Sequence, residues 1–185
     1  MVFTQRRDGA KDTGRQKEKV MAEHQKRVDL VEEYLEQVDL NKNLRDYYAG
    51  RTVLVTGGAG AIGSNLIIAL SMLVGERGKV VVLDNLSAIK TDSAWNVAPL
   101  TNIMFVYGDV RSDVDLKRVF KEDPSVVFHL AAFFANQNSI DYPEVSAEVD
   151  VIGQIRLLEY ARLAKVERFV YASSGCAIYG SYPQL

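Results

Sequence analysis

Three regularly spaced glycines form the stretch of this sequence whose chemistry is easiest to predict. Gly57, Gly60 and Gly63 follow an apolar run at 52–56 and precede an apolar pattern of helical period. A strand, a tight turn and a helix N-terminus are therefore expected in succession. Such a turn binds a dinucleotide pyrophosphate, because glycines let the backbone approach the phosphates and the helix offers free N–H groups. The alternative is a purely structural turn; a mononucleotide P-loop is disfavoured, since no Gly-Lys-Ser/Thr follows.

Acidic residues follow the next two predicted strands. Asp84 ends the apolar run at 79–84 and lies 27 residues after Gly57. A carboxylate there accepts hydrogen bonds from the adenosine ribose and repels a 2′-phosphate, which favours NAD over NADP. Lys90 lies nearby and leaves a phosphate contact open. Asp109 follows the third strand and is expected to accept from the adenine amino group, unless it only caps the next helix.

Serines end the fifth predicted strand. The hydroxyl of Ser173 or Ser174 is placed to bind a substrate hydroxyl or keto oxygen while hydride moves to or from a nicotinamide. Both are also common cap and turn residues. Cys176 follows, but nothing near it indicates a lowered pKa. His129 lies inside the fourth strand, where a structural role is expected.

The elements that must position these residues follow from the apolar periodicity. Strand and helix patterns alternate from residue 52 onward, which predicts an α/β fold with a doubly wound parallel sheet. The expected strands are 52–56, 79–84, 102–107, 126–130 and 168–173, and the expected helices are 62–74, 112–121 and one that follows a loop at 131–143 and ends near 165. Another helix is expected at 17–48, packed on its own domain or on a second subunit, with His24 on its surface.

Composition and charge narrow the class of protein. With 185 residues, 48% of them hydrophobic and 25% charged, a single globular domain is expected. The net charge of −2 does not indicate nucleic-acid binding, and no apolar run is long enough to predict a membrane span. A single cysteine favours a reducing, cytoplasmic location. No metal site is predicted.

The predicted organisation has three parts. Residues 1–20 hold six Lys/Arg against three Asp/Glu, so residues 1–16 are expected to be a basic, disordered tail. A helical extension at 17–50 and a cofactor-binding domain at 51–185 are expected to follow.

Several motifs occur together in order. They read Val-Thr-Gly-Gly-Ala-Gly-Ala-Ile-Gly-Ser, Leu-Asp-Asn-Leu-Ser, Gly-Asp-Val-Arg, His-Leu-Ala-Ala and Tyr-Ala-Ser-Ser-Gly-Cys-Ala-Ile-Tyr-Gly. Over residues 51–182 the chain resembles the extended short-chain dehydrogenase/reductase family, particularly NAD-dependent nucleotide-sugar epimerases and dehydratases of the UDP-glucose 4-epimerase type. The resemblance implies a Rossmann-type sheet, a bound NAD that transiently oxidises a sugar hydroxyl, a UDP-sugar substrate, and a homodimer formed by helices that flank the fourth and fifth strands.

The resemblance also implies site residues. Ser174 matches the catalytic hydroxyl, with Ser173 in reserve. The expected cofactor contacts are Gly57, Gly60, Ala61, Ile62, Gly63, Asp84, Asn85, Asp109, Val110, Leu130, Ala131, Ala132 and Ser173.

Three departures from the family pattern bear on activity. The family's catalytic Tyr-x-x-x-Lys pair is absent from these 185 residues, so the chain alone is expected to turn over little or no substrate. Asp150 stands where the family usually has Asn, and Phe134 stands where some epimerases carry a cofactor-contacting lysine. Two alternatives therefore stay open: a non-catalytic dinucleotide-binding or regulatory module with the N-terminal helix as its partner surface, or a reductase acting on another carbonyl substrate.

Overall fold

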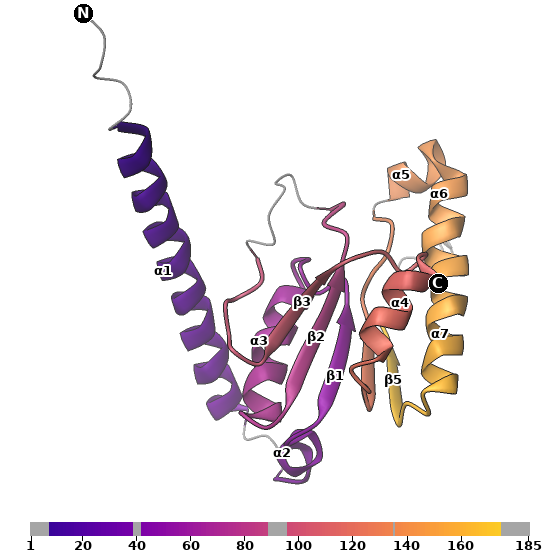
Figure 1. Ribbon diagram of the computed structural model, residues 1–185, viewed down its shortest axis with the longest axis horizontal. Helices are drawn as coiled ribbons and strands as arrows, with labels where there is room; N and C mark the ends of the chain where they lie inside the picture. Colours follow the sequence, from indigo (N-terminus) through magenta and orange to yellow (C-terminus); the bar gives the residue numbers. More distant parts are fainter. Residues whose placement is uncertain (1–7, 39–41, 89–95, 135, 175–185) are drawn as a thin grey trace, which may run out of the picture.

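A five-stranded parallel sheet forms the centre of the molecule (Figure 1). The computed structural model describes residues 8–38, 42–88, 96–134 and 136–174. The sheet order is β3-β2-β1-β4-β5. The strands are β1 (Thr52–Thr56), β2 (Lys79–Asp84), β3 (Ile103–Tyr107), β4 (Val126–His129) and β5 (Arg168–Tyr171). The chain steps outward from β1 to β3 and then returns to the other side of β1, so the predicted doubly wound α/β fold is confirmed.

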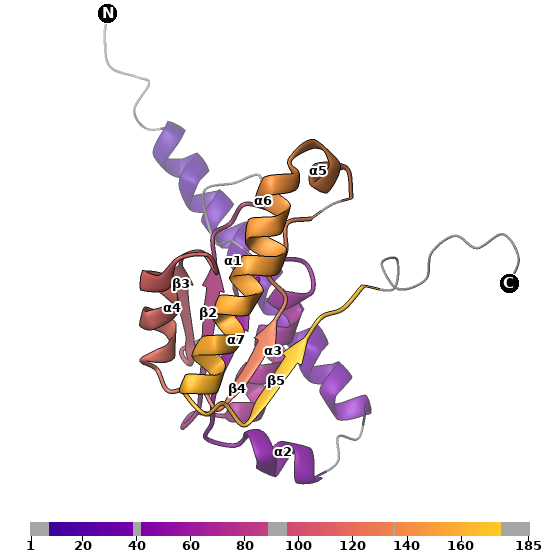
Figure 2. The ribbon, with the colours of Figure 1, turned by 90° about the vertical axis from the view of Figure 1, so that its right-hand side faces the viewer.

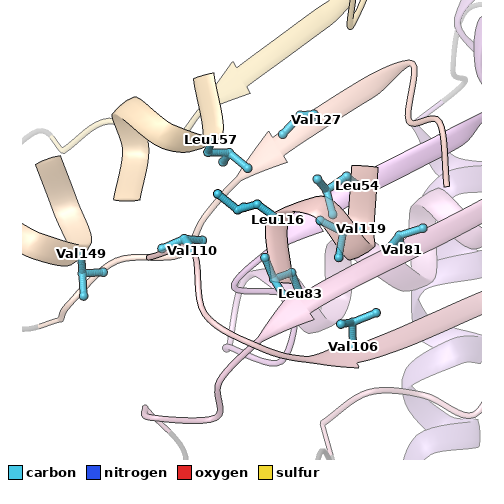
Figure 3. Close-up of a cluster of buried hydrophobic side chains, with 10 residues drawn as sticks. All are labelled: Leu54, Val81, Leu83, Val106, Val110, Leu116, Val119, Val127, Val149 and Leu157. Carbon is cyan, nitrogen blue, oxygen red and sulfur yellow. The ribbon is translucent and has the colours of Figure 1, made fainter. Parts of the chain in front are cut away.

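Alternating side chains of the strands fill two separate apolar layers. Leu54 of β1 faces a core completed by α4 (Asp113–Phe120) and α7 (Gln154–Leu163), and Figure 3 shows this cluster. Val53 and Val55 face the opposite core, against α3 (Gly63–Val74). Since both faces are covered, the central strands read as continuous Val/Leu runs rather than as alternating polar and apolar residues.

The helical segment before β5 differs from the single helix expected there. Within the predicted loop at 131–143 lies a short helix, α5 (Asn136–Asp141), and α6 (Pro143–Ala147) follows it. A π-helical turn, η1 (Glu148–Gly153), connects α6 to α7, and together they form one continuous rod in Figure 2. Gly153 allows this rod to pack closely, because a Cβ there would lie 2.9 Å from Cγ2 of Val110. Tertiary packing of this kind is not visible in a periodicity pattern.

The N-terminal helix α1 (Asp8–Gln37) forms a further layer outside α3. It begins at Asp8 rather than at residue 17, so part of the segment expected to be a disordered tail is helical. Figure 1 shows its C-terminal half beside α3 and its N-terminal half extending away from the sheet. A short helix, α2 (Lys42–Tyr48), leads into β1 and buries Tyr48 in the core beside α3.

The prediction that His24 lies on the surface was wrong. His24 is only 6% exposed, and its Nδ1 has no hydrogen-bond partner among the described residues. Burial lowers the pKa of His24, and the nearby Arg27 charge lowers it further. The neutral imidazole is therefore part of the apolar side of α1.

None of the helices in the described part of the chain is both long enough and apolar enough to cross a lipid bilayer.

Candidate nucleotide-binding site

The glycine turn between β1 and α3 has the geometry predicted from its spacing. Gly57 has φ +72°, and a Cβ there would lie 2.7 Å from the backbone nitrogen of Ala131. A Cβ on Gly63 would overlap the carbonyl oxygen of Gly57. Only glycine fits these two positions, because the turn is left-handed at the first and the helix packs tightly on the turn at the second.

The start of α3 leaves hydrogen-bond donors free at this turn. The backbone N–H groups of Ala61 and Ile62 have no backbone acceptor among the described residues, and both residues are exposed. Ile62 supplies no side-chain cap to the helix. Unpaired N–H groups at the positive end of a helix dipole bind anions such as the phosphates of a dinucleotide.

Asp84 lies beside this turn, at the end of β2. One carboxylate oxygen accepts from the N–H of Ala59 at 2.9 Å, and the other accepts from the N–H of Leu86 at 2.8 Å. The carboxylate is half-buried and held in one orientation by two backbone donors. Each oxygen keeps a further lone pair, so a ribose hydroxyl is able to donate to it.

The carboxylate of Asp109, which follows β3, already accepts hydrogen bonds from other protein groups, and this bears on its predicted contact with adenine. Its two carboxylate oxygens accept from the backbone, Nε and Nη2 of Arg111 and from Nδ2 of Asn85. These four bonds use about all the acceptor sites of a carboxylate. Burial alone would raise the pKa of Asp109, but the hydrogen bonds from Arg111 and Asn85 outweigh burial and lower it. Asp109 therefore links Asn85, which follows β2, to Arg111, which follows β3.

The helix after Asp109 is capped in part as its sequence suggests. The hydroxyl of Ser112 accepts from the N–H of Asp115 at 3.3 Å. The carboxylate of Asp115 turns instead to the N–H of Asp109, at 3.0 Å, and ties β3 to α4. Val110 between them is 4% exposed and packs in the core, so only its backbone is available to a cofactor.

A cavity lined by charged residues lies next to Asp109. Arg111 also pairs with Glu148 at 3.0 Å, and both line a cavity of ≈ 520 Å³ together with Arg156. This cavity lies between the β3–α4 turn and the η1–α7 rod, and Asp109 is part of its lining.

On the other side of the glycine turn from β2 and β3, a cavity of ≈ 310 Å³ opens beside β4 and β5. Its lining brings together three of the predicted site residues that follow β4 with Ser174, which follows β5. These four residues are Leu130, Ala131, Ala132 and Ser174. Ser173 is exposed but does not line this cavity, and Cys176 and Lys90 lie outside the described residues.

His129 lines this cavity, but it is buried and hydrogen-bonded within the sheet, as expected for a structural residue. It is 2% exposed, and its Nδ1 lies 2.7 Å from the hydroxyl of Thr56 on β1. The same hydroxyl accepts from the N–H of Ala131 at 3.3 Å, so Thr56 links β4 to the turn after it. Burial lowers the pKa of His129 to about 4, with the negative charge of Asp150 acting in the opposite direction.

Two contributors to the site had no predicted role. Thr56 is recognisable only by its place directly before the first glycine. Arg27 on α1 donates to the Asn96 carbonyl at 3.0 Å and to the Ser64 hydroxyl at 2.8 Å, and Asn96 in turn donates to the Ala59 carbonyl of the glycine turn at 3.0 Å. No local pattern marks Arg27, because its partners lie far away in the sequence.

Fold and site together define a class of protein. A parallel sheet with a glycine turn at its switch point, a carboxylate after β2 and a cavity after β4 and β5 forms a dinucleotide-binding domain. The family is shown by comparison with known proteins: a model of the NAD dependent epimerase/dehydratase family matches residues 53–185. The chain belongs to this family, whose cofactor is NAD.

Individual relatives agree with this assignment. UDP-glucose 4-epimerase of Mycolicibacterium smegmatis is 40% identical over 131 residues, which cover 70% of this chain and 41% of that protein. Among solved structures, epimerase Mth375 of Methanothermobacter thermautotrophicus has a TM-score of 0.69 at 52% identity, covering 75% of this chain and 40% of that one. The NAD complex of Thermus thermophilus UDP-glucose 4-epimerase has a TM-score of 0.61 at 39% identity, with coverages of 72% and 40%. The chain thus spans about two fifths of the length of the curated relatives it matches.

Proposed function

We propose that this chain is the NAD-binding portion of a nucleotide-sugar epimerase, with residues 51–185 as the cofactor domain and the preceding helices as an extension. The observation that carries the proposal is the glycine turn with its free N–H groups beside Asp84. The pyrophosphate would lie on Ala61 and Ile62, and the adenosine ribose would lie on Asp84.

The remaining parts of the cofactor follow from the order of the strands. With the ribose at β2, the adenine reaches toward β3, where the backbone of Val110 is available. The nicotinamide half then extends to the cavity at β4 and β5, beside Ala131 and Ala132. NAD supplies hydride acceptance and return at a sugar carbon when it is bound.

Within that cavity, Ser174 is the proposed group for the sugar. Its hydroxyl would hydrogen-bond the reacting sugar hydroxyl and hold it toward the nicotinamide end of the site. A relative supports the proposed substrate class: a Thermotoga maritima UDP-glucose 4-epimerase structure contains UDP-glucose. We therefore favour a UDP-sugar as the substrate and epimerisation as the reaction. The alternative reaction is dehydration, which relatives such as dTDP-D-glucose 4,6-dehydratase of Dictyostelium discoideum carry out.

Two further proposals concern the setting of the protein. A homodimer is supported by apolar residues left exposed on η1 and α7, among them Ile152, Ile155 and Leu158. A cytoplasmic location is supported by the single cysteine, Cys176.

Thermal unfolding with and without cofactor tests the proposed function. At about 100 times Kd, NAD should stabilise the fold by about 2.7 kcal/mol and raise Tm by roughly 5–10 °C. NADP should have a smaller effect, because Asp84 repels the 2′-phosphate. Asp84→Ala should weaken the binding of NAD, and the exposed carboxylate variant Glu33→Ala on α1 serves as its control.

The same preparation should convert no UDP-glucose to UDP-galactose, because no Tyr-x-x-x-Lys pair occurs in the sequence. Measurable turnover would show that the Tyr-x-x-x-Lys pair is not needed for activity, and equal effects of NAD and NADP would overturn the role of Asp84.

A further inference from the structure

Asp150 is a carboxylate placed in the wall of the cavity beside β4 and β5. It lies in the π-helical turn η1 and contacts the chain that follows β4. Its Oδ1 accepts from the N–H of Phe133 at 2.8 Å, and its Oδ2 accepts from the hydroxyl of Ser146 at 2.9 Å. π-helical turns of this kind often occur at functional sites.

Both oxygens of the Asp150 side chain accept hydrogen bonds, from the N–H of Phe133 and from the hydroxyl of Ser146, which is the arrangement of an ionised carboxylate. Within the described residues no Lys or Arg forms an ion pair with Asp150. The cavity therefore contains a negative charge that is hydrogen-bonded but not neutralised.

The position of this charge matters because of the part of the cofactor that would lie there. This step rests on the proposed function: with the adenosine half over β2 and β3, the nicotinamide half occupies the cavity that Asp150 lines. The nicotinamide ring is positively charged in NAD⁺ and uncharged in NADH. A nearby carboxylate attracts only the oxidised form by Coulomb interaction, most strongly where protein excludes water.

We propose that Asp150 sets the redox preference of the site, binding NAD⁺ more tightly relative to NADH than an uncharged residue would. The charge would hold the cofactor in the form that accepts hydride from a sugar hydroxyl. It would also make the bound reduced form a stronger donor for the return of hydride.

Asp150→Asn isolates the charge. The Asn carbonyl oxygen accepts from Phe133, and its NH₂ donates to the Ser146 oxygen, so both hydrogen bonds persist. Titration with NAD⁺, NADH and ADP-ribose should show a fall of about tenfold in the NAD⁺/NADH affinity ratio, with the ADP-ribose affinity unchanged. Asp141→Asn removes the same charge from exposed α5, away from the cavity lining, and should leave the ratio unaltered.

A second variant covers the case in which Asp150→Asn does not fold. Phe134 lines the same cavity and is 82% exposed, so Phe134→Lys adds a positive charge without disturbing the core. It should also lower the NAD⁺/NADH affinity ratio.

Each outcome has a separate meaning. If the wild-type chain binds neither form, the proposed function fails and this inference fails with it. If both forms bind and the ratio is the same in Asp150→Asn, or in Phe134→Lys where Asp150→Asn is unfolded, the proposed function stands and the redox role of Asp150 is wrong.

Discussion

Gly57 combines a left-handed backbone with a close approach to Ala131, and these two constraints can be measured separately. Gly75 has a similar φ of +67°, but a Cβ there would meet nothing within 4 Å. Its ψ of −170° places it in a region open almost only to glycine, so we expect Gly75→Ala to cost about 1–3 kcal/mol of unfolding free energy from backbone strain alone. Gly57→Ala should cost about 2–4 kcal/mol, because overlap with Ala131 is added.

Urea unfolding of the two variants gives the comparison. The difference between them reports the contact across the switch point, and equal losses would show that the turn relaxes away from Ala131.

His129 makes the stability of the fold depend on pH. Burial lowers its pKa in the folded state from 6.5 to about 4, so the unfolded chain binds more protons between these values. Stability contributed by the neutral imidazole is present above pH 6.5 and is lost as the pH falls toward 4, on the order of 3 kcal/mol in all. When the free energy of unfolding is measured with denaturant from pH 7 to pH 4, it should change less with pH for His129→Gln than for the wild type. A parallel decline in both would assign the pH dependence to other groups.

At the scale of elements, one side chain connects α1 to the nucleotide site. Arg27 donates to Asn96, Ser64 and Asn65, and Asn96 continues to the glycine turn through Ala59. Arg27→Met should therefore destabilise the fold by about 1–3 kcal/mol and expose α1 to limited proteolysis.

Lys26→Met is the matched control, since Lys26 is the exposed neighbouring cation on the same helix. If both variants are cleaved at the same rate, α1 is not held through Arg27.

At the scale of the whole molecule, the exposed apolar residues of α7 lie on the side of the sheet away from α1 (Figure 1). If two copies pair through this surface, Ile155→Glu should shift the chain from dimer to monomer in sedimentation experiments. Tyr34→Glu, at an exposed aromatic on α1, should leave the dimer intact. A wild-type monomer at micromolar concentration would contradict the proposed pairing.

Local patterns in the sequence were sufficient for the elements and for part of the site. The strand, turn and helix at 52–74 and the buried Val/Leu runs were predicted because the period and the glycine spacing depend only on neighbouring residues. Asp84 was placed beside the turn by the same logic, since carboxyl ends of parallel strands meet at one edge. The contacts assigned to individual site residues stay predictions until a cofactor complex tests them.

Only the tertiary structure decided the contacts between residues far apart in the chain. The burial of His24, the bond from Arg27 to Asn96, and the occupation of Asp109 by Asn85 depend on how layers pack, which no local period encodes. The hydrogen bond between Asp150 in the π turn and Phe133 likewise joins residues that no local period relates. The sequence by itself determined a dinucleotide fold of a known family, and packing decided which charges surround the cofactor.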